Sequence, residues 1–263
     1  MVIEAKFVLD ASGYGRVLPK LLSLELPSTL SNKRAVFCHF EDNIPKSSEA
    51  KNYDRNKILI TVHPSKKDVW FWLIPFSDGT VSYGVVGDVS YFDSNKTDEE
   101  VLDEFTQQEP HLSRLLSEAK KITPVRSLQG YSSDVTRLYG DRFALLGNAG
   151  EFLDPVFSSG VTIAMCSASM AANLLHKQLS GEDVCWQQEF SEPLTKGIKV
   201  FKHFVMSWYD TNLQNIIFFQ EDENEVKAMI CSILAGYAWD DDNPYVNKTE
   251  RRLSALIDIC QSK

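Results

Sequence analysis

One short segment restricts the possible folds of this chain more than any other feature. Small and turn-forming residues from Gly147 to Gly160 precede an alanine-rich apolar stretch, residues 161–179, that predicts a long helix. A helix start at Ser158-Ser159-Gly160 offers free N–H groups and a partial positive charge, which favour an anion or the electron-rich edge of a ligand. A helix capped by Ser158 or Ser159, with glycines used only for packing, explains the same residues without a ligand.

The remaining elements predict a mixed α/β fold. Residues 5–10 are apolar and end in Asp10-Ala11-Ser12-Gly13, which indicates a buried strand running into a tight glycine turn. Strands, most of them antiparallel, are predicted at residues 34–41, 58–63, 69–75, 81–86, 129–134 and 143–146. Helices are predicted from the Thr97 cap onward and at residues 111–120, 161–179, 185–219, 224–237 and 248–261, with Pro193 and Pro244 as breaks.

A second signal is the aromatic run from Trp70 to Pro75. In a strand, Trp70, Trp72 and Ile74 share one face, and Phe71 and Leu73 share the other. Two tryptophans on one face suit the wall of a pocket beside an aromatic cofactor or substrate. An ordinary sheet core accounts for the same alternation.

Composition excludes several classes of function. The formal net charge of −9 argues against nucleic-acid binding, because phosphate neutralisation needs clustered Lys and Arg. The histidines and cysteines lack metal-ligand spacing, so no metal site is predicted. Five scattered cysteines fit a reducing cytoplasm better than a disulfide framework. The sequence contains no apolar run of about 18 residues, so it predicts no membrane span.

The motifs resemble those of the flavin-dependent halogenases. Residues 70–75 match the W-x-W-x-I-P motif of that family, and residues 147–161 are similar to its G-D-A-x-x-F-x-D-P-V-F-S-S-G-V. Residues 10–13 resemble the D-A-S-G turn that follows a strand of the FAD domain. Residues 243–246, Asn-Pro-Tyr-Val, are similar to the N-P-F-V found late in phenol- and pyrrole-type members.

The resemblance implies the fold of the single-component aromatic hydroxylases. We therefore expect a partial FAD-binding domain at residues 1–30 and 127–180 and an antiparallel-sheet substrate domain at residues 31–126. A helical C-terminal region is expected at residues 181–263. Residues 10–13 should lie close to residues 147–160, because the family places both segments against one flavin.

The same resemblance supplies the candidate site residues. Asn148 is expected at a ribityl hydroxyl of FAD, and Ser159, Gly160 and Val161 should donate N–H groups toward the isoalloxazine ring. The full set of expected cofactor-binding residues is Asp10, Gly13, Gly147, Asn148, Asp154, Ser158, Ser159, Gly160 and Val161. The expected halide and pocket residues are Ser159, Gly160, Trp70 and Trp72.

Several positions depart from the family pattern. The G-x-G-x-x-G that seats the FAD pyrophosphate is absent, and Gly13-Tyr14-Gly15 does not replace it. The reactive lysine of the family lies in the same amino-terminal part, which we expect to be missing, so no catalytic residue is assigned. Phe157 stands where tryptophan halogenases carry a glutamate and fits the phenol, pyrrole or carrier-tethered branch. Glu151 is charged where small or apolar residues are usual, so it either faces solvent or disfavours halide.

These observations leave three functions open. The first is an FAD-dependent halogenase of the cytoplasm that uses reduced FAD, O2 and halide on a small aromatic or carrier-bound substrate, with a separate flavin reductase. The second is a non-halogenating FAD oxidoreductase or monooxygenase of the same fold. The third is a truncated, non-catalytic remnant. Because the pyrophosphate seat is missing, we expect this chain alone to bind FAD weakly or not at all and to self-associate through exposed apolar surface.

Overall fold

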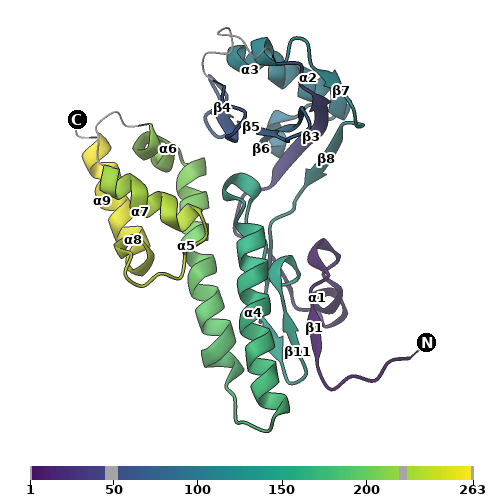
Figure 1. Ribbon diagram of the computed structural model, residues 1–263, viewed down its shortest axis with the longest axis vertical. Helices are drawn as coiled ribbons and strands as arrows, with labels where there is room; N and C mark the ends of the chain where they lie inside the picture. Colours follow the sequence, from purple (N-terminus) through teal and green to yellow (C-terminus); the bar gives the residue numbers. More distant parts are fainter. Residues whose placement is uncertain (1, 45–52, 219–223, 262–263) are drawn as a thin grey trace. The chain divides into compact units, whose positions relative to one another are not determined.

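The computed structural model describes residues 2–44, 53–218 and 224–261. The chain divides into two units, residues 1–30 with 131–263 (unit 1) and residues 31–130 (unit 2). Unit 1 thus groups the expected helical region with the amino-terminal strand and the glycine-rich segment. The expected mixed α/β fold with an antiparallel sheet and a helical carboxyl-terminal part is confirmed (Figure 1).

Unit 2 is built on one antiparallel sheet with strand order β4-β5-β6-β3-β7, and β8 also pairs with β3. The strands are β3 Lys33–Glu41, β4 Leu59–Val62, β5 Trp70–Pro75, β6 Thr80–Asp88, β7 Lys120–Lys121 and β8 Arg126–Gln129. The 3₁₀ turn η3 is Val89–Tyr91, and the helices are α2 Asp98–Gln108 and α3 Pro110–Leu115. Thr97 caps the start of α2, as the sequence predicts, and Glu100 completes a reciprocal capping box with it.

The two faces of β5 serve different purposes. Phe71 and Leu73 are fully buried in the apolar core that also holds Val101, Leu102 and Phe105 of α2. Burying these large side chains is the main driving force for packing the helices on the sheet.

On the opposite face, the Trp70 and Trp72 ring centroids lie 5.8 Å apart. The Trp72 indole nitrogen donates to the Ser82 hydroxyl at 3.1 Å. The Trp72 ring covers Gly84, where a Cβ would come within 2.4 Å of it. The predicted alternation of the two faces is therefore confirmed.

Unit 1 joins two small sheets to a layer of helices. In the first sheet, β1 Val8–Asp10 pairs in parallel with β11 Phe143–Leu145, which pairs with β10 Tyr139–Gly140. The second sheet pairs β2 Glu25–Pro27 with β9 Ser133–Val135. The short turns are η1 Gly13–Gly15, η4 Gly147–Ala149, η5 Pro155–Phe157 and the π-helical turn η6 Gln187–Ser191. The helices are α1 Val17–Leu21, α4 Ser159–Leu179, α5 Glu192–Tyr209, α6 Asn212–Ile217, α7 Asn224–Leu234, α8 Pro244–Asn247 and α9 Thr249–Gln261. Figure 1 shows α4 and α5 running antiparallel along this unit.

Three sequence predictions were wrong in their boundaries. The strand predicted at residues 129–134 is two strands, because Gly130 adopts φ +60 between β8 and β9. The helix predicted at residues 111–120 ends at Leu115, after which β7 pairs with β3. The helix predicted at residues 185–219 is interrupted at Thr211, which has φ +69; residue 219 lies outside the described residues.

Candidate functional site

The turn after β11 is shaped by close packing against α4. Gly147 adopts φ +52, and a Cβ placed on it would lie 2.8 Å from the Cβ of Ala164. Its N–H donates to the Ser167 hydroxyl at 3.0 Å, and that hydroxyl donates to the Ala164 carbonyl. Only glycine satisfies both the positive φ and the close approach. The small-residue signal in the sequence is therefore explained by a turn pressed against a helix.

The turn after β1 is held by the Asp10 carboxylate. This side chain is 5% exposed and accepts hydrogen bonds from the N–H groups of Ser12, at 2.9 Å, and Leu18, at 2.7 Å. Burial raises the pKa of Asp10, but these hydrogen bonds and the nearby Arg16 charge outweigh it and hold the pKa below its usual value. The Asp10 carbonyl also accepts from the Leu146 N–H at 2.9 Å, so the two turns are joined at their strand ends.

A buried arginine clamps this pair of turns. Arg16 is 6% exposed and adopts φ +48. Its guanidinium group donates hydrogen bonds to five acceptors. Three are the backbone carbonyls of Asn148 and Gly150 (3.2 Å each) and of Asp134 (2.9 Å). The other two are the Ser133 hydroxyl (2.6 Å) and the Glu25 carboxylate (3.0 Å). Because its fork is planar and always charged, one side chain fixes η4 to both β2 and β9. Sequence reasoning missed Arg16.

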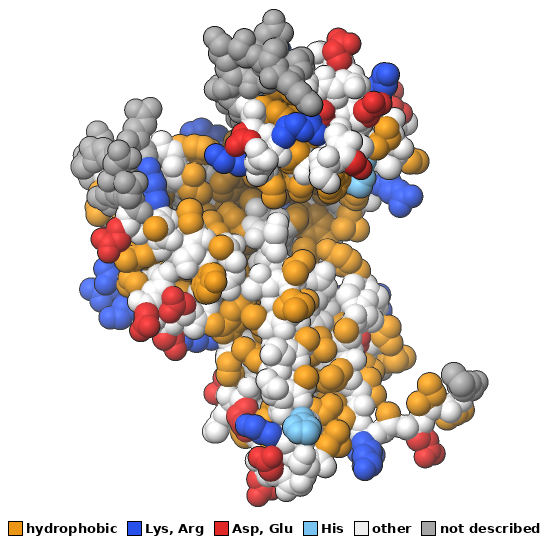
Figure 2. Space-filling model, viewed as in Figure 1, with side chains coloured by type: hydrophobic (Ala, Val, Ile, Leu, Met, Phe, Trp, Pro, Cys, Tyr) orange, Lys and Arg blue, Asp and Glu red, His pale blue; other side chains and the backbone are white. Residues whose placement is uncertain are grey.

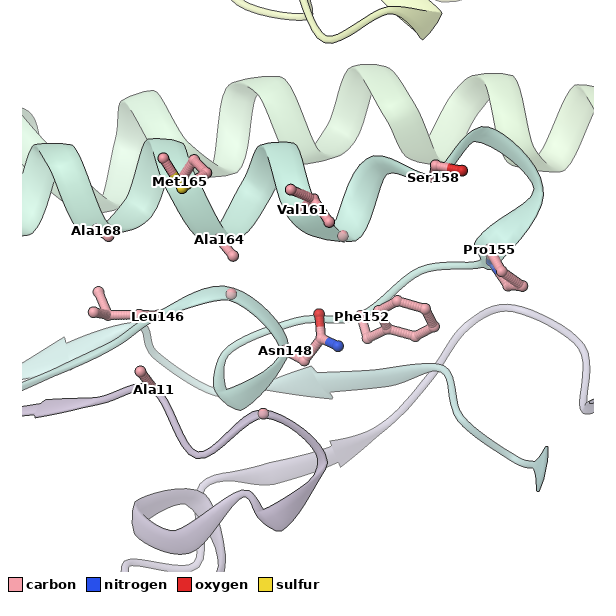
Figure 3. Close-up of a pocket in the computed structure, with 13 residues that line it drawn as sticks. Ala11, Leu146, Asn148, Phe152, Pro155, Ser158, Val161, Ala164, Met165 and Ala168 are labelled. Carbon is pink, nitrogen blue, oxygen red and sulfur yellow. The ribbon is translucent and has the colours of Figure 1, made fainter. Parts of the chain in front are cut away.

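The two turns and the start of α4 enclose a pocket of about 600 Å³. Gly13 of η1 and Gly160 of α4 line it. Asn148 of η4 and Val161 of α4 also line it and are labelled in Figure 3. The expectation that residues 10–13 lie beside residues 147–160 is confirmed. The complete lining is Ala11, Gly13, Leu146, Gly147, Asn148, Phe152, Pro155, Ser158, Gly160, Val161, Ala164, Met165 and Ala168.

The pocket is apolar with a few placed polar groups. Figure 3 shows Ala164 and Ala168 pointing from α4 toward Leu146 and Ala11. Asn148 carries the side-chain amide among the lining residues. Apolar walls with a small number of orienting polar groups are typical of cofactor and small-molecule sites.

The start of α4 presents backbone rather than side chains. Ser158 adopts φ +53, and no side-chain hydrogen bond caps this end of the helix. At Gly160, a Cβ would lie 3.2 Å from the Phe152 ring and 3.5 Å from the Asn148 amide oxygen. A ligand edge can therefore approach the first-turn N–H groups closely. The sequence alternative in which Ser158 or Ser159 caps the helix is not what the structure shows.

Val161 and Met165 extend the apolar wall to the surface. Their side chains are 73% and 69% exposed and lie one helical turn apart. Figure 2 shows hydrophobic side chains over the side of α4 that faces the viewer. An exposed apolar stripe next to a pocket marks a surface that contacts another molecule or segment.

Asp154 stabilises the turn that leads into α4. It is 1% exposed and accepts hydrogen bonds from the Val156 N–H and the Tyr209 hydroxyl, each at 2.9 Å. Burial, together with the Asp154 charge, raises the pKa of Tyr131 far above its usual value. Asp154 thus fixes the η5 turn that leads into α4 and does not line the pocket.

Glu151 belongs to a partly buried charge cluster. Lys202 of α5 lies 3.5 Å from the Glu151 carboxylate and 3.2 Å from that of Asp134. Burial and the hydrogen-bonded Asp134 carboxylate raise the pKa of Glu151 to about 8, against the lowering effect of Lys202. The side chain is 13% exposed and is not among the residues that line the pocket.

The structure sorts the expected site residues into two groups. Gly13, Gly147, Asn148, Ser158, Gly160 and Val161 line the pocket. Asp10, Asp154 and Ser159 are buried and do not line it, and the Asp10 and Asp154 carboxylates hold its turns. Trp70 and Trp72 belong to unit 2, whereas the described lining residues all come from unit 1, so their pocket role stays a prediction.

The described residues contain neither a metal-binding cluster nor a membrane-spanning helix. Within residues 2–44, 53–218 and 224–261, no cluster of three or more His, Cys, Asp or Glu side chains is arranged to hold a metal ion. Over the same residues, no helix is long and apolar enough to cross a membrane.

Fold comparison defines the class of the protein. A solved structure from Cytophaga hutchinsonii, described as a flavoprotein/dehydrogenase, superposes with a TM-score of 0.90 at 41% identity over 97% of this chain and 62% of its own. Other solved neighbours include flavin-dependent halogenases and brominases. The fold is that of the FAD-dependent halogenases, of the aromatic-hydroxylase type.

Sequence comparison identifies the family. The family model described as tryptophan halogenase matches residues 1–233. The 1H-pyrrole-2-carbonyl-[peptidyl-carrier protein] chlorinase of Pseudomonas fluorescens is 29% identical over 83% of this chain and 49% of its own length. The corresponding brominase of Pseudoalteromonas luteoviolacea is 27% identical over 72% of this chain and 45% of its own. The chain therefore belongs to the flavin-dependent halogenase family, whose cofactor is FAD, and spans about half the length of these relatives.

Proposed function

We propose that this chain forms the flavin-ring side of an FAD-dependent halogenase. The observation that carries the proposal is the convergence of Gly13, Asn148 and Gly160 on one apolar pocket at the uncapped start of α4. When bound, FAD supplies the redox chemistry that makes halide reactive toward an electron-rich ring. The residues described here bind and orient that cofactor.

The pocket suits the ring and ribityl end of FAD. Gly13 has φ +59 with open space where a Cβ would point, whereas at Gly160 that position lies 3.2 Å from the Phe152 ring. In this proposal, Asn148 bonds a ribityl hydroxyl. The proposed role of the first-turn N–H groups of α4, at Ser159, Gly160 and Val161, is to stabilise negative charge on the reduced ring or on a halide beside it.

We further propose an aromatic substrate of the phenol or pyrrole type, free or bound to a carrier protein. Two relatives act on a pyrrole-2-carbonyl group attached to a peptidyl-carrier protein, which supports this class. Phe157 packs edge-on against Trp208, with ring centroids 6.0 Å apart, so this position is apolar. Trp70 and Trp72 are proposed to form the substrate-side wall.

The reaction is proposed to take place in the cytoplasm with reduced flavin from a separate reductase. Cys38, Cys166, Cys185, Cys231 and Cys260 are all free thiols, which supports a reducing compartment. The chain alone is proposed to self-associate through apolar surface such as the exposed stripe of α4.

A non-halogenating FAD oxidoreductase is the second candidate. It is favoured by one observation, the 41% identity to the protein described as a flavoprotein/dehydrogenase. Both candidates use the same pocket, so the pocket geometry does not separate them.

Halide dependence separates the two candidates. The protein expressed from its complete reading frame is supplied with FAD, a flavin reductase, NADH and a pyrrole-2-carbonyl carrier protein or a free phenol. Halogenation predicts a brominated product, detected by mass spectrometry, only when bromide is present. Oxygenated product at the same rate with and without bromide would favour the second candidate and overturn the first.

A further inference from the structure

A basic groove lies in unit 1 between α5 and the α8–α9 pair, and the flavin pocket does not use any of these helices. Its volume is about 440 Å³. The charged or titratable side chains that line it are Lys196, Lys199, His203, Lys248, Glu250 and Arg251. Helix α9 contacts both α5 and α8 in this part of the chain. The proposed halogenase reaction gives this groove no role.

The charges in the groove are mostly unneutralised. Lys196 forms an ion pair with Asp241, and Glu250 is the one acidic residue among the lining residues. Lys199, Lys248 and Arg251 are exposed, and no salt bridge to any of them is found within the described part of the chain. This concentration of positive charge stands out in a protein with a formal net charge of −9.

The helical spacing keeps these cations close together. Lys196, Lys199 and His203 follow one face of α5. Lys248 directly precedes α9, and Arg251 lies in its first turn. The Nδ1–H of His203 donates to the Lys199 carbonyl at 2.8 Å, which leaves Nε2 available. Like charges at this spacing repel one another. An anionic group that binds in the groove reduces this repulsion and so stabilises the folded state.

We propose that this groove is the docking site for the acidic, phosphate-bearing face of a carrier protein. The inference rests on the proposed carrier-bound substrate. A carrier protein holds its acyl group on an arm that is joined to the protein through a phosphodiester. A negative charge therefore lies where the arm is attached to the carrier protein. Arg251 offers a planar guanidinium group for a phosphate, and Lys199 and Lys248 offer further positive charges in the same groove.

Charge complementarity of this kind affects association more than the chemistry in the flavin pocket. Opposite charges steer the encounter and raise the association rate, and salt screens the effect. The docking site therefore predicts carrier binding that weakens as ionic strength rises.

Binding of a loaded carrier protein tests the proposal directly. The chain is titrated with a peptidyl-carrier protein carrying a pyrrole-2-carbonyl arm, at low and at high salt, by isothermal titration calorimetry. The double variant Lys199→Glu/Arg251→Glu reverses two exposed groove charges. The double variant Lys6→Glu/Arg142→Glu is the matched control, because both residues are exposed and lie outside the groove in the same unit.

We expect the groove variant to weaken carrier binding by roughly tenfold or more at low salt and to lose most of the salt dependence. The control variant should bind like the wild type, and far-UV circular dichroism should be the same for all three proteins.

Equal binding by the groove variant and the control would overturn the docking site while leaving the proposed function intact. A wild-type chain that does not bind the carrier would overturn both the docking site and the carrier-bound substrate. Phosphopantetheine alone is the third probe. If it binds as tightly as the loaded carrier, the groove recognises a small phosphate ester and the protein-docking proposal is wrong.

Discussion

Gly147→Ala should destabilise the protein through two separable effects. The first is the positive φ of +52, which costs an L-residue about 1–2 kcal/mol. The second is the contact with Ala164, whose Cβ would lie 2.8 Å from the new methyl group. Overpacking of this kind typically costs about 1–3 kcal/mol. The expected loss is therefore about 2–5 kcal/mol of unfolding free energy.

Gly13→Ala isolates the first effect. Gly13 has a similar φ of +59, but nothing lies within 4 Å of its ideal Cβ position. Replacing glycine also reduces the entropy of the unfolded chain, and this gain is common to both variants. The difference between their free energies of unfolding thus measures the steric contact alone.

The assay is equilibrium unfolding in urea followed by circular dichroism. With an unchanged m-value, the shift in midpoint reports the change in stability. Gly147→Ala should be less stable than Gly13→Ala by about 1–3 kcal/mol. If Gly147→Ala costs no more than Gly13→Ala, the turn is not pressed against α4 and the packing argument for the pocket is refuted.

Three further predictions concern residues around the pocket. Arg16→Lys should lower stability by about 3 kcal/mol in the urea assay, because lysine cannot satisfy the buried acceptors that the guanidinium fork joins; an unchanged midpoint would contradict the clamp. Glu151→Gln should remove a pH dependence. The folded-state pKa of about 8 lies above the ordinary value of 4.5, so the wild-type protein loses stability as pH rises through that window and the variant does not. Parallel pH profiles would disprove this assignment. Gly160→Val should abolish flavin-dependent activity with an unchanged far-UV circular dichroism spectrum, because the added side chain meets Phe152 and blocks the helix start. Wild-type turnover would show that the site is elsewhere.

The sequence predicts those features that depend on residues close together in the chain. Gly147 and Gly160 had to be small, and the alternation from Trp70 to Leu73 followed from the pleat of a strand. The family motifs then placed residues 10–13 beside residues 147–160, which no periodicity shows. The pocket confirms that proximity.

The sequence does not predict side-chain contacts between residues that are far apart in the chain. Arg16 bonds to residues more than 100 positions away, and an arginine after a glycine turn resembles a solvated surface residue. Lys202 of α5 lies 3.5 Å from the Glu151 carboxylate, although the two residues are far apart in the chain. The sequence alone therefore does not determine the environment of Glu151. The predicted strand across Gly130 was wrong for a different reason, because a glycine with positive φ ends the β conformation there.

The central claim is that this chain supplies the ring side of a flavin site, and titration with two flavins tests it most directly. FAD and riboflavin share the isoalloxazine ring and ribityl chain, but only FAD carries the pyrophosphate and adenosine. Since the sequence lacks the G-x-G-x-x-G pyrophosphate seat, both flavins should bind weakly, with affinities within roughly threefold of each other. Binding is measured as quenching of flavin fluorescence, and Gly160→Val should abolish the binding of both flavins. Purified protein that is yellow with stoichiometric FAD, or a Gly160→Val variant that binds riboflavin as the wild type does, would contradict the account.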